Sequence, residues 1–425
     1  MNPRKFLPQE LKLLAILTAV QFSSVVDFVI MMPLGPQLTQ DLHFHSIQQF
    51  TLVVGAYNFA AAFSGFIGGL YIERFERKRA LLFLLAGFIL GTEACALSRS
   101  FYTLLGARFL AGLFGGVLGA VATAIVGDQI PYARRGAAMG ILMSSFSIAL
   151  VVGVPAGLEL ANSWSWEVPF MVVALFATAI LIAAWFLLPE MKRADAGPPS
   201  APWATLREVF REPNHLWAFA LTSIIMFAGF SLFPLLATYV QFNMGLAPQN
   251  IKYMYLIGGL ITAFTGPLIG RLADRFGKHR VFFIVGFGSI APILIVSHTG
   301  FLPTAWILVL TTCFMVLMSG RFVPAMAMIT AAVKPSVRGS FMSLNSSFQQ
   351  LSGAIATLVV GMIVVQSEQE PIQHYGRVGV MAAILTFCAL FIGLRLRTHQ
   401  DAPTTPPAPG APTEAPAPEV AAAEM

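Results

Sequence analysis

Long apolar segments alternate with short polar connections along almost the whole chain. Each apolar segment has about 20 residues or more, enough to cross the ~30 Å hydrocarbon core of a bilayer as a helix. Most of them lack the polar face that a helix of a soluble protein needs. The pattern predicts twelve transmembrane helices, at 13–38, 48–72, 80–98, 102–127, 136–160, 168–189, 216–241, 251–273, 280–298, 303–331, 340–365 and 376–396.

Composition agrees with an all-α membrane protein and excludes most other classes. Only 11% of the residues are charged and 56% are hydrophobic, whereas soluble proteins carry roughly 25% charged residues. Cys95, Cys313 and Cys388 all lie within apolar segments, so neither a disulfide framework nor a metal site is expected. An enzyme is not expected either, because no nucleophile with a plausible base and no phosphate-binding glycine loop is found.

The basic residues indicate topology rather than nucleic-acid binding. The two ends of the chain and every second connection hold 21 of the 26 Lys and Arg residues, while the other connections hold Arg99, Lys252 and Arg377. Cytoplasmic loops of membrane proteins are enriched in Lys and Arg. Both termini are therefore expected in the cytoplasm.

A charged loop that occurs twice indicates an internal duplication. GLYIERFERKR at 69–79 and GRLADRFGKHR at 270–280 each join two apolar segments, about half the chain apart. Two similar six-helix bundles with a pathway between them are expected. The expected segments are an N-terminal cytoplasmic segment 1–12, bundles 13–189 and 216–397, a connecting loop 190–215 with a short amphipathic helix, and a disordered cytoplasmic tail 398–425.

In these two repeated loops, the chain resembles the major facilitator superfamily, and the resemblance extends over about residues 10–397. The second loop follows that family's G-x-L-A-D-R-x-G-R/K-[RK]-R motif closely, whereas the first has Glu73 for the acidic Asp and Glu76 for a glycine. The resemblance implies two cytoplasmic latches that hold the outward-facing state, with Asp128 as the expected partner of Arg74 or Arg77. The latch residues are Gly69, Glu73, Arg74, Arg77, Asp128, Gly270, Asp274, Arg275, Gly277 and Lys278.

The fifth predicted helix contains a second motif. Gly153-Val154-Pro155-Ala156-Gly157 looks like the G-P-x-x-G signature of drug:proton antiporters, in the form found in sugar-efflux-like members. Gly153 and Gly157 would thin this helix against the other half, and Pro155 would bend it as a hinge. The alternative is that they are ordinary packing glycines.

Charged residues inside the predicted helices are the main site candidates, because placing one there costs at least ~2.5–3.5 kcal/mol. Asp27 and Arg321 lie near the middle of helices that line the pathway in the family, and they are the leading pair. Arg108 matches an arginine common in the fourth helix, with Glu93 as its expected partner. Burial raises the pKa of a carboxylate and a nearby cation lowers it. A balance between these effects would let Asp27 take up and release a proton. The alternative is that Asp27 forms a structural salt bridge.

Neutral polar residues within the helices complete the predicted proton and substrate site. These are Tyr57, Asn58, Gln241, Asn345 and Gln349. Phe and Met dominate around them, which suits apolar or amphipathic solutes.

The sequence thus predicts a secondary transporter of the bacterial inner membrane that exports such compounds by alternating access, in exchange for protons. A lysolipid transporter, a sugar or metabolite exporter and a non-transporting receptor are the alternatives. No cofactor is expected, since the proton gradient would drive transport. The expected partners are the lipid bilayer, a small-molecule substrate and protons, with no nucleic acid, and the chain is expected to be a monomer.

Overall fold

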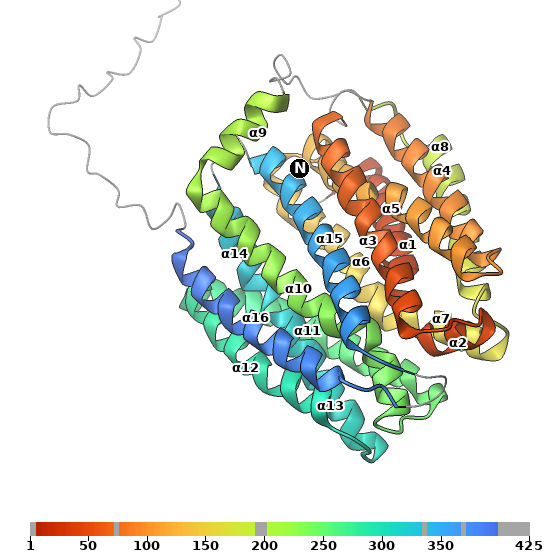
Figure 1. The fold of residues 1–425 in the computed structure, drawn as a ribbon. Helices are drawn as coiled ribbons and strands as arrows, with labels where there is room; N and C mark the ends of the chain where they lie inside the picture. The colour runs from red at the N-terminus through yellow and green to blue at the C-terminus, as the bar shows by residue number, and fades with distance from the viewer. Residues whose placement is uncertain (1–5, 72–75, 192–201, 334–337, 367–370, 398–425) are drawn as a thin grey trace, which may run out of the picture.

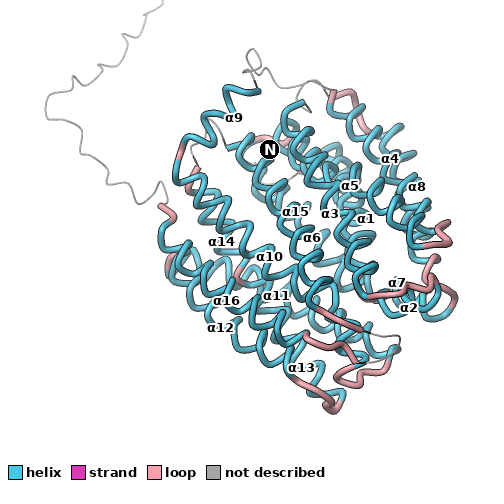
Figure 2. Tube along the Cα trace, in the orientation of Figure 1, coloured by secondary structure: helices cyan, strands magenta, loops and turns pink. Residues whose placement is uncertain are grey.

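The computed structural model describes residues 6–71, 76–191, 202–333, 338–366 and 371–397. Within these ranges, twelve helical spans are long and apolar enough to cross a membrane. The predicted all-α fold with twelve membrane helices is confirmed. Helices run the length of the molecule and loops gather at its two ends (Figure 2).

The helices of the two halves of the chain lie on two sides of the molecule (Figure 1). The first half comprises α1 (Pro8–Ile30), α2 (Gly35–Asp41), α3 (Ile47–Tyr71), α4 (Arg77–Ala96), α5 (Phe101–Gln129), α6 (Tyr132–Ile148), the π-turn η2 (Ala149–Gly153), α7 (Val154–Ser163) and α8 (Val168–Leu187). The second half comprises α9 (Pro202–Arg211), α10 (Pro213–Phe242), η3 (Pro248–Asn250), α11 (Ile251–Phe276), α12 (Lys278–His298), α13 (Thr304–Gly320), α14 (Phe322–Ala331), α15 (Arg338–Ile363) and α16 (Tyr375–Arg395). Helices α3 and α15 pack together where the halves meet.

Three predicted helices are interrupted. The first ends at Ile30 and resumes as α2 at Gly35, because Pro33 disfavours helical geometry before it. The fifth is divided by η2 just before Pro155, whose missing N–H removes one helical hydrogen bond and allows a wider turn. The tenth is divided at Arg321, between α13 and α14.

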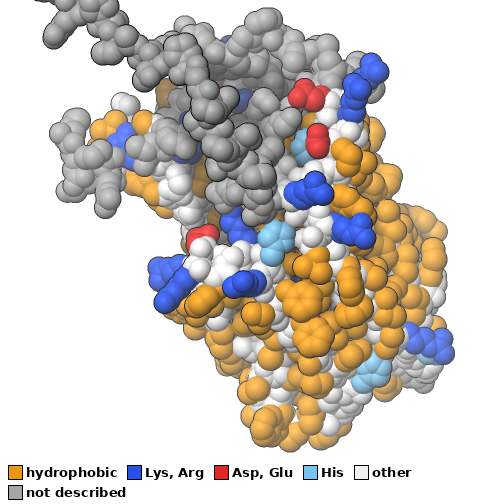
Figure 3. Space-filling model, turned by 90° about the vertical axis from the view of Figure 1, so that its left-hand side faces the viewer, with side chains coloured by type: hydrophobic (Ala, Val, Ile, Leu, Met, Phe, Trp, Pro, Cys, Tyr) orange, Lys and Arg blue, Asp and Glu red, His pale blue; other side chains and the backbone are white. Residues whose placement is uncertain are grey.

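We call the end where α1, α4, α6, α10, α12 and α15 begin the basic end, because the basic connections lie there. Hydrophobic side chains cover much of the lower part of the face in Figure 3, and most of its visible Lys and Arg lie nearer the upper, basic end. The predicted amphipathic helix is present as α9, but its apolar face packs on the second half: Val209 is fully buried and the Phe210 ring lies 5.7 Å from that of Phe219.

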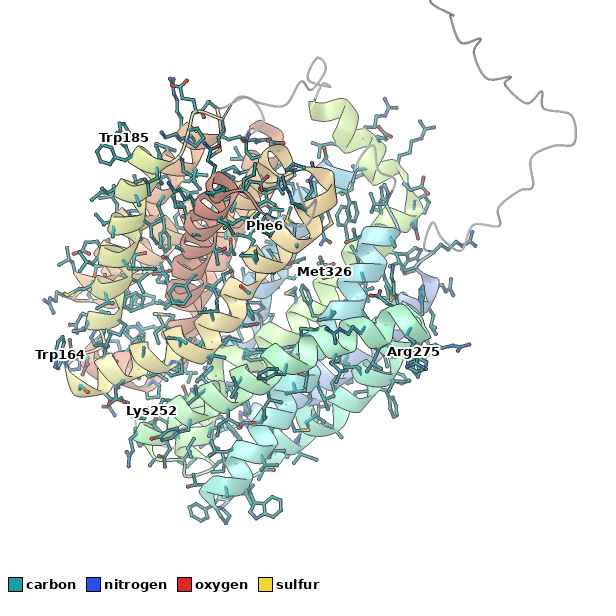
Figure 4. The ribbon with its side chains drawn as sticks, turned by 180° about the vertical axis from the view of Figure 1, so that it is seen from behind. Phe6, Trp164, Trp185, Lys252, Arg275 and Met326 are labelled. Atoms are coloured by element: carbon teal, nitrogen blue, oxygen red, sulfur yellow. The ribbon has the colours of Figure 1, made fainter. Side chains whose placement is uncertain are left out.

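The halves meet at the opposite end and separate between α6 and α11 toward the basic end. A Cβ added at Gly259 of α11 would lie 3.0 Å from Leu150 of η2, whereas nothing lies within 4 Å of one added at Gly266 of α11 or Gly140 of α6. Lys252 of α11 forms an ion pair with Glu159 of α7 at the opposite end. Figure 4 shows α7 close to α11 near Trp164 and Lys252, while α6, farther along the same span, diverges from α11.

The two repeated loops have different backbones. Gly277 has φ +96°, a conformation that favours glycine. Glu76, at the matching place, has φ −63° and caps α4 instead: its carboxylate accepts hydrogen bonds from the backbone N–H groups of Lys78 and Arg79. It also accepts one from the N–H of Met191, just after α8. The glutamate thus replaces the turn that glycine allows with a cap that joins α4 to the end of α8.

Glu76 gives a pH-dependent prediction. Burial raises the pKa of this carboxylate, but the backbone N–H groups of Met191, Arg79 and Lys78 lower it by more, so it stays below the usual value. The charged cap therefore stabilises the fold at neutral pH and is lost as the pH falls through the folded-state pKa. We expect Glu76→Ala to lower the unfolding free energy by about 1 kcal/mol at pH 7. The difference should disappear in thermal unfolding at a pH well below the usual carboxylate pKa of about 4.3. An equal loss at both pH values would contradict the charged cap.

Candidate functional site

A fully buried ion pair lies between α1 and α5. Arg108 Nη1 is 2.9 Å from Asp27 Oδ2, and neither side chain has any solvent exposure. The same nitrogen also donates to the backbone carbonyl of Asp27, at 3.3 Å. Two opposite charges are thus held together within the membrane-spanning part of the first half.

Two further side chains complete this cluster. Thr92 of α4 donates a hydrogen bond to Asp27 Oδ1 at 3.1 Å. The Arg108 guanidinium lies 4.5 Å from the centre of the Tyr57 ring of α3, a favourable cation–π geometry. Arg108 Nε and Nη2 are buried with no hydrogen-bond partner among the described residues. These two donors can serve a solute or water.

Glycines set the close spacing of the helices that carry the cluster. A Cβ at Gly112 of α5 would lie 2.3 Å from the backbone oxygen of Tyr57, and one at Gly91 of α4 would lie 2.5 Å from the backbone nitrogen of Ala111. Only a residue without a side chain allows such backbone contact. The position of Tyr57 over Arg108 therefore depends on glycine in α5.

The predicted partner of Arg108 is wrong. Arg108 pairs with Asp27 rather than with Glu93, whose side chain is half-buried and takes no part in the pair. Arg321 does not pair with Asp27: it is buried between α13 and α14 and donates a hydrogen bond to Thr386 of α16. The two arginines were indistinguishable in the sequence, because pairing depends on the direction of each side chain around its helix.

Beside the cluster, residues of both halves meet. The Phe28 ring of α1 lies 5.1 Å from the Tyr57 ring and 5.8 Å from the Phe230 ring of α10. Asn58 of α3 is fully buried, and neither its amide nitrogen nor its oxygen has a hydrogen-bond partner among the described residues. A Cβ at Gly353 of α15 would lie 3.1 Å from Phe230 and 3.4 Å from Asn58. An aromatic pair and an unsatisfied amide thus lie where the halves touch.

The other predicted polar residues lie in different places. Asn345 is fully buried in α15, with no partner for its amide among the residues described. Gln349 of α15 directs its amide nitrogen to the Met326 sulfur, at 3.7 Å. Gln241 is half-buried next to the last residue of α10, at the opposite end. No described contact joins these three to Asp27.

The sequence predicted that Gly153 and Gly157 face the other half, but in the structure they face α1. A Cβ at Gly153 would lie 2.3 Å from Val26 of α1, and one at Gly157 would lie 2.8 Å from Ile30 of α1. They bring η2 and α7 against α1 beside Asp27, and the π-turn η2 ends at Gly153, two residues before Pro155. The close contact of η2 with the other half is made by Gly259 of α11 instead.

The latch residues are partly described. The expected pair of Arg77 with Asp128 is present, with 2.8 Å between Nε and Oδ2. Asp274 and Arg275 are exposed at the end of α11. Gly270 lies in α11, Gly277 forms the turn and Lys278 begins α12. Gly69 lies in α3, while Glu73 and Arg74 fall outside the described residues.

Sequence reasoning missed Thr92, Phe28 and Phe230. Thr92 is a single hydroxyl in an apolar segment, next to the more conspicuous Glu93. The two phenylalanines cannot be told from 34 others in a chain with 36. Of the three residues, only Thr92 could have been selected from the sequence, by its hydroxyl within an apolar segment.

Comparison with known proteins identifies the family. The Major Facilitator Superfamily profile matches residues 17–357 and again 232–423. The chain is 27% identical over 356 residues to the multidrug resistance protein MdtG of Enterobacter lignolyticus (strain SCF1), covering 80% of each chain. It is 25% identical over 232 residues to a probable sugar efflux transporter of Helicobacter pylori (strain P12), covering 55% of this chain and 58% of that protein.

Among solved structures, the fold resembles that of a bacterial homolog to the human lysosomal transporter Spinster, in an inward-facing and occupied conformation. The TM-score is 0.72 at 15% identity, covering 92% of this chain and 97% of the other. Because the profile matches more than half of the sequence, this chain belongs to the Major Facilitator Superfamily and is a multi-pass membrane transporter, not an enzyme.

Proposed function

We propose that this transporter exports small apolar or amphipathic compounds in exchange for protons, with Asp27 as the proton carrier. The observation that supports this proposal most is the buried Asp27–Arg108 pair. An ionisable carboxylate inside a membrane protein is costly to bury and is commonly part of a proton relay. The unsatisfied Arg108 donors allow the pair to exchange partners during a transport cycle.

The packing of the two halves supports alternating access. Contact at the opposite end and separation of α6 from α11 at the basic end correspond to a state open toward the cytoplasm, if the basic end is cytoplasmic. Exposed Asp274 and Arg275 fit a latch that is disengaged in this state. Opening at the other end would break the Lys252–Glu159 pair, which is partly exposed and weak.

A sugar or metabolite exporter is the second candidate. The buried Asn58 amide, with no partner for either of its polar atoms among the described residues, favours a solute that forms hydrogen bonds. A lysolipid or another amphipathic lipid would use the aromatic pair Phe28–Phe230 for its apolar part. Competition of transport by a cationic dye, a disaccharide or a lysolipid separates these substrate classes.

The proton-exchange proposal is tested in proteoliposomes that hold the wild-type protein and a pH-sensitive dye. An outward gradient of a transported compound is expected to drive protons in the opposite direction, with a rate proportional to compound flux. Protein-free liposomes control for passive leakage. Compound flux without proton movement would refute antiport while leaving transport itself intact.

A further inference from the structure

A pocket of about 650 Å³ lies at the opposite end, away from the Asp27 cluster. Its walls come from both halves of the chain. The first half supplies α2 and the segment up to the start of α3, and the second half supplies Thr238 and Phe242 of α10 and also Gln366. A pocket of this size can hold a small organic molecule.

Thr238 contributes a buried hydroxyl to the pocket lining. Its side chain is buried, and its hydroxyl has no hydrogen-bond partner among the described residues. Burying such a group without a partner is unfavourable. Gly35 of α2 is close by, since a Cβ there would lie 3.1 Å from the Thr238 hydroxyl oxygen. The hydroxyl therefore sits where the two halves approach each other.

The lining selects the chemical class of the ligand. It combines hydrogen-bonding groups with apolar surfaces and contains no Asp, Glu, Lys or Arg; the hydrogen-bonding residues are Thr39, Gln40, His43, His45, Ser46, Thr238 and Gln366. Near the pocket lies Asp41, whose pKa is raised by burial and by Glu167, against the opposing effect of His43. The Asp41 carboxylate, which follows the lining residue Gln40 in the chain, would disfavour an anion. A neutral molecule with several hydroxyl groups and an apolar face fits best.

We propose that this pocket is a regulatory site for neutral, hydroxyl-rich solutes such as saccharides, acting from the side of the membrane opposite the basic end. Because both halves form its walls, the pocket is complete only while that end is closed. A ligand that binds one conformation stabilises that conformation. A solute at ten times its Kd lowers the rate of opening about tenfold, and transport slows to the extent that this opening limits it. The proposal does not depend on proton coupling.

Two substitutions remove pocket groups with little strain. Thr238→Val replaces the unsatisfied hydroxyl with a methyl group. His43→Gly removes the imidazole from a backbone with φ +50°, which glycine adopts readily. Thr312→Val is the matched control, because Thr312 is another buried threonine with an unsatisfied hydroxyl and does not line the pocket.

The experiment measures thermal unfolding of the full chain in detergent against maltose concentration, with gluconate and choline as charged probes. We expect a saturable maltose shift in the wild type and in Thr312→Val, and its loss in Thr238→Val and His43→Gly. The ligand-free unfolding midpoint of Thr238→Val should be unchanged or higher. A non-saturating shift, equal in all variants, would reflect general exclusion of the sugar from protein surfaces and overturn the proposal. So would the absence of a shift, or equal shifts with gluconate or choline.

Discussion

Asp27→Asn is expected to abolish the proton-driven component of transport. For exchange of one proton, a gradient of two pH units supplies ~2.7 kcal/mol, enough for ~100-fold accumulation of the exported compound. Asn keeps the size of the side chain and a hydrogen-bond acceptor for Thr92, but it cannot take up a proton. Accumulation in proteoliposomes with an imposed pH gradient should fall from about that ratio to about 1.

Asp27→Asn also leaves Arg108 charged and without its carboxylate, inside the first half. Removing one partner of a buried pair costs ~3–5 kcal/mol of stability. The double variant Asp27→Asn/Arg108→Gln removes both charges and should recover most of this loss in thermal unfolding. It should still show no proton-driven accumulation.

Glu93→Gln is the matched control for Asp27→Asn. Glu93 is the neighbour of Thr92 in α4, is half-buried and takes no part in the pair, so coupled accumulation should be unchanged. If the double variant still accumulated its substrate along the pH gradient, the pair would be structural only. Asp27 would then not be the proton carrier.

Gly112→Ala is expected to separate α3 from α5. The new Cβ would lie 2.3 Å from the backbone oxygen and 2.7 Å from the Cα of Tyr57, and backbone atoms cannot move aside as a flexible side chain can. Overpacking of this kind costs ~1–3 kcal/mol or more, against a gain of ~1 kcal/mol for Ala over Gly in a helix. Because Tyr57 packs over Arg108, transport should fall as well as the thermal unfolding midpoint.

The same helix provides the control. Nothing lies within 4 Å of a Cβ added at Gly106 of α5. Gly106→Ala should therefore raise the unfolding midpoint, or leave it unchanged, with normal transport. Equal unfolding midpoints for the two alanine variants would show that α3 and α5 are not in backbone contact at Gly112.

The fold could be predicted from the sequence because a membrane imposes one strong pattern. Twenty apolar residues in a row must form a helix in lipid, where every backbone group needs an internal partner. Breaks in these helices were harder to predict. Pro155 was recognised as a bend, and η2 precedes it, but the interruption at Arg321 was not predicted.

The sequence indicated the two residues of the buried pair but not their contact. Asp27 and Arg108 were both selected, because a charge in an apolar segment is rare. Their pairing could not be predicted from the sequence. The rotation of each helix about its axis decides which residues face a neighbouring helix. The Arg77–Asp128 pair was predicted correctly because both residues lie at helix ends on the same side of the membrane.

The hydrogen bond from Met191 to Glu76 limits how far the halves can move. It fastens the chain to α4 just after α8, while α9, which begins at Pro202, contacts α10 and α15 of the second half. The backbone between Met191 and Pro202 therefore works as a tether of fixed contour length. Eleven residues span at most ~36–40 Å. The chain itself therefore limits how far the two halves can separate at the basic end. Shortening this tether would restrict the stroke of the transporter without altering any residue of its site.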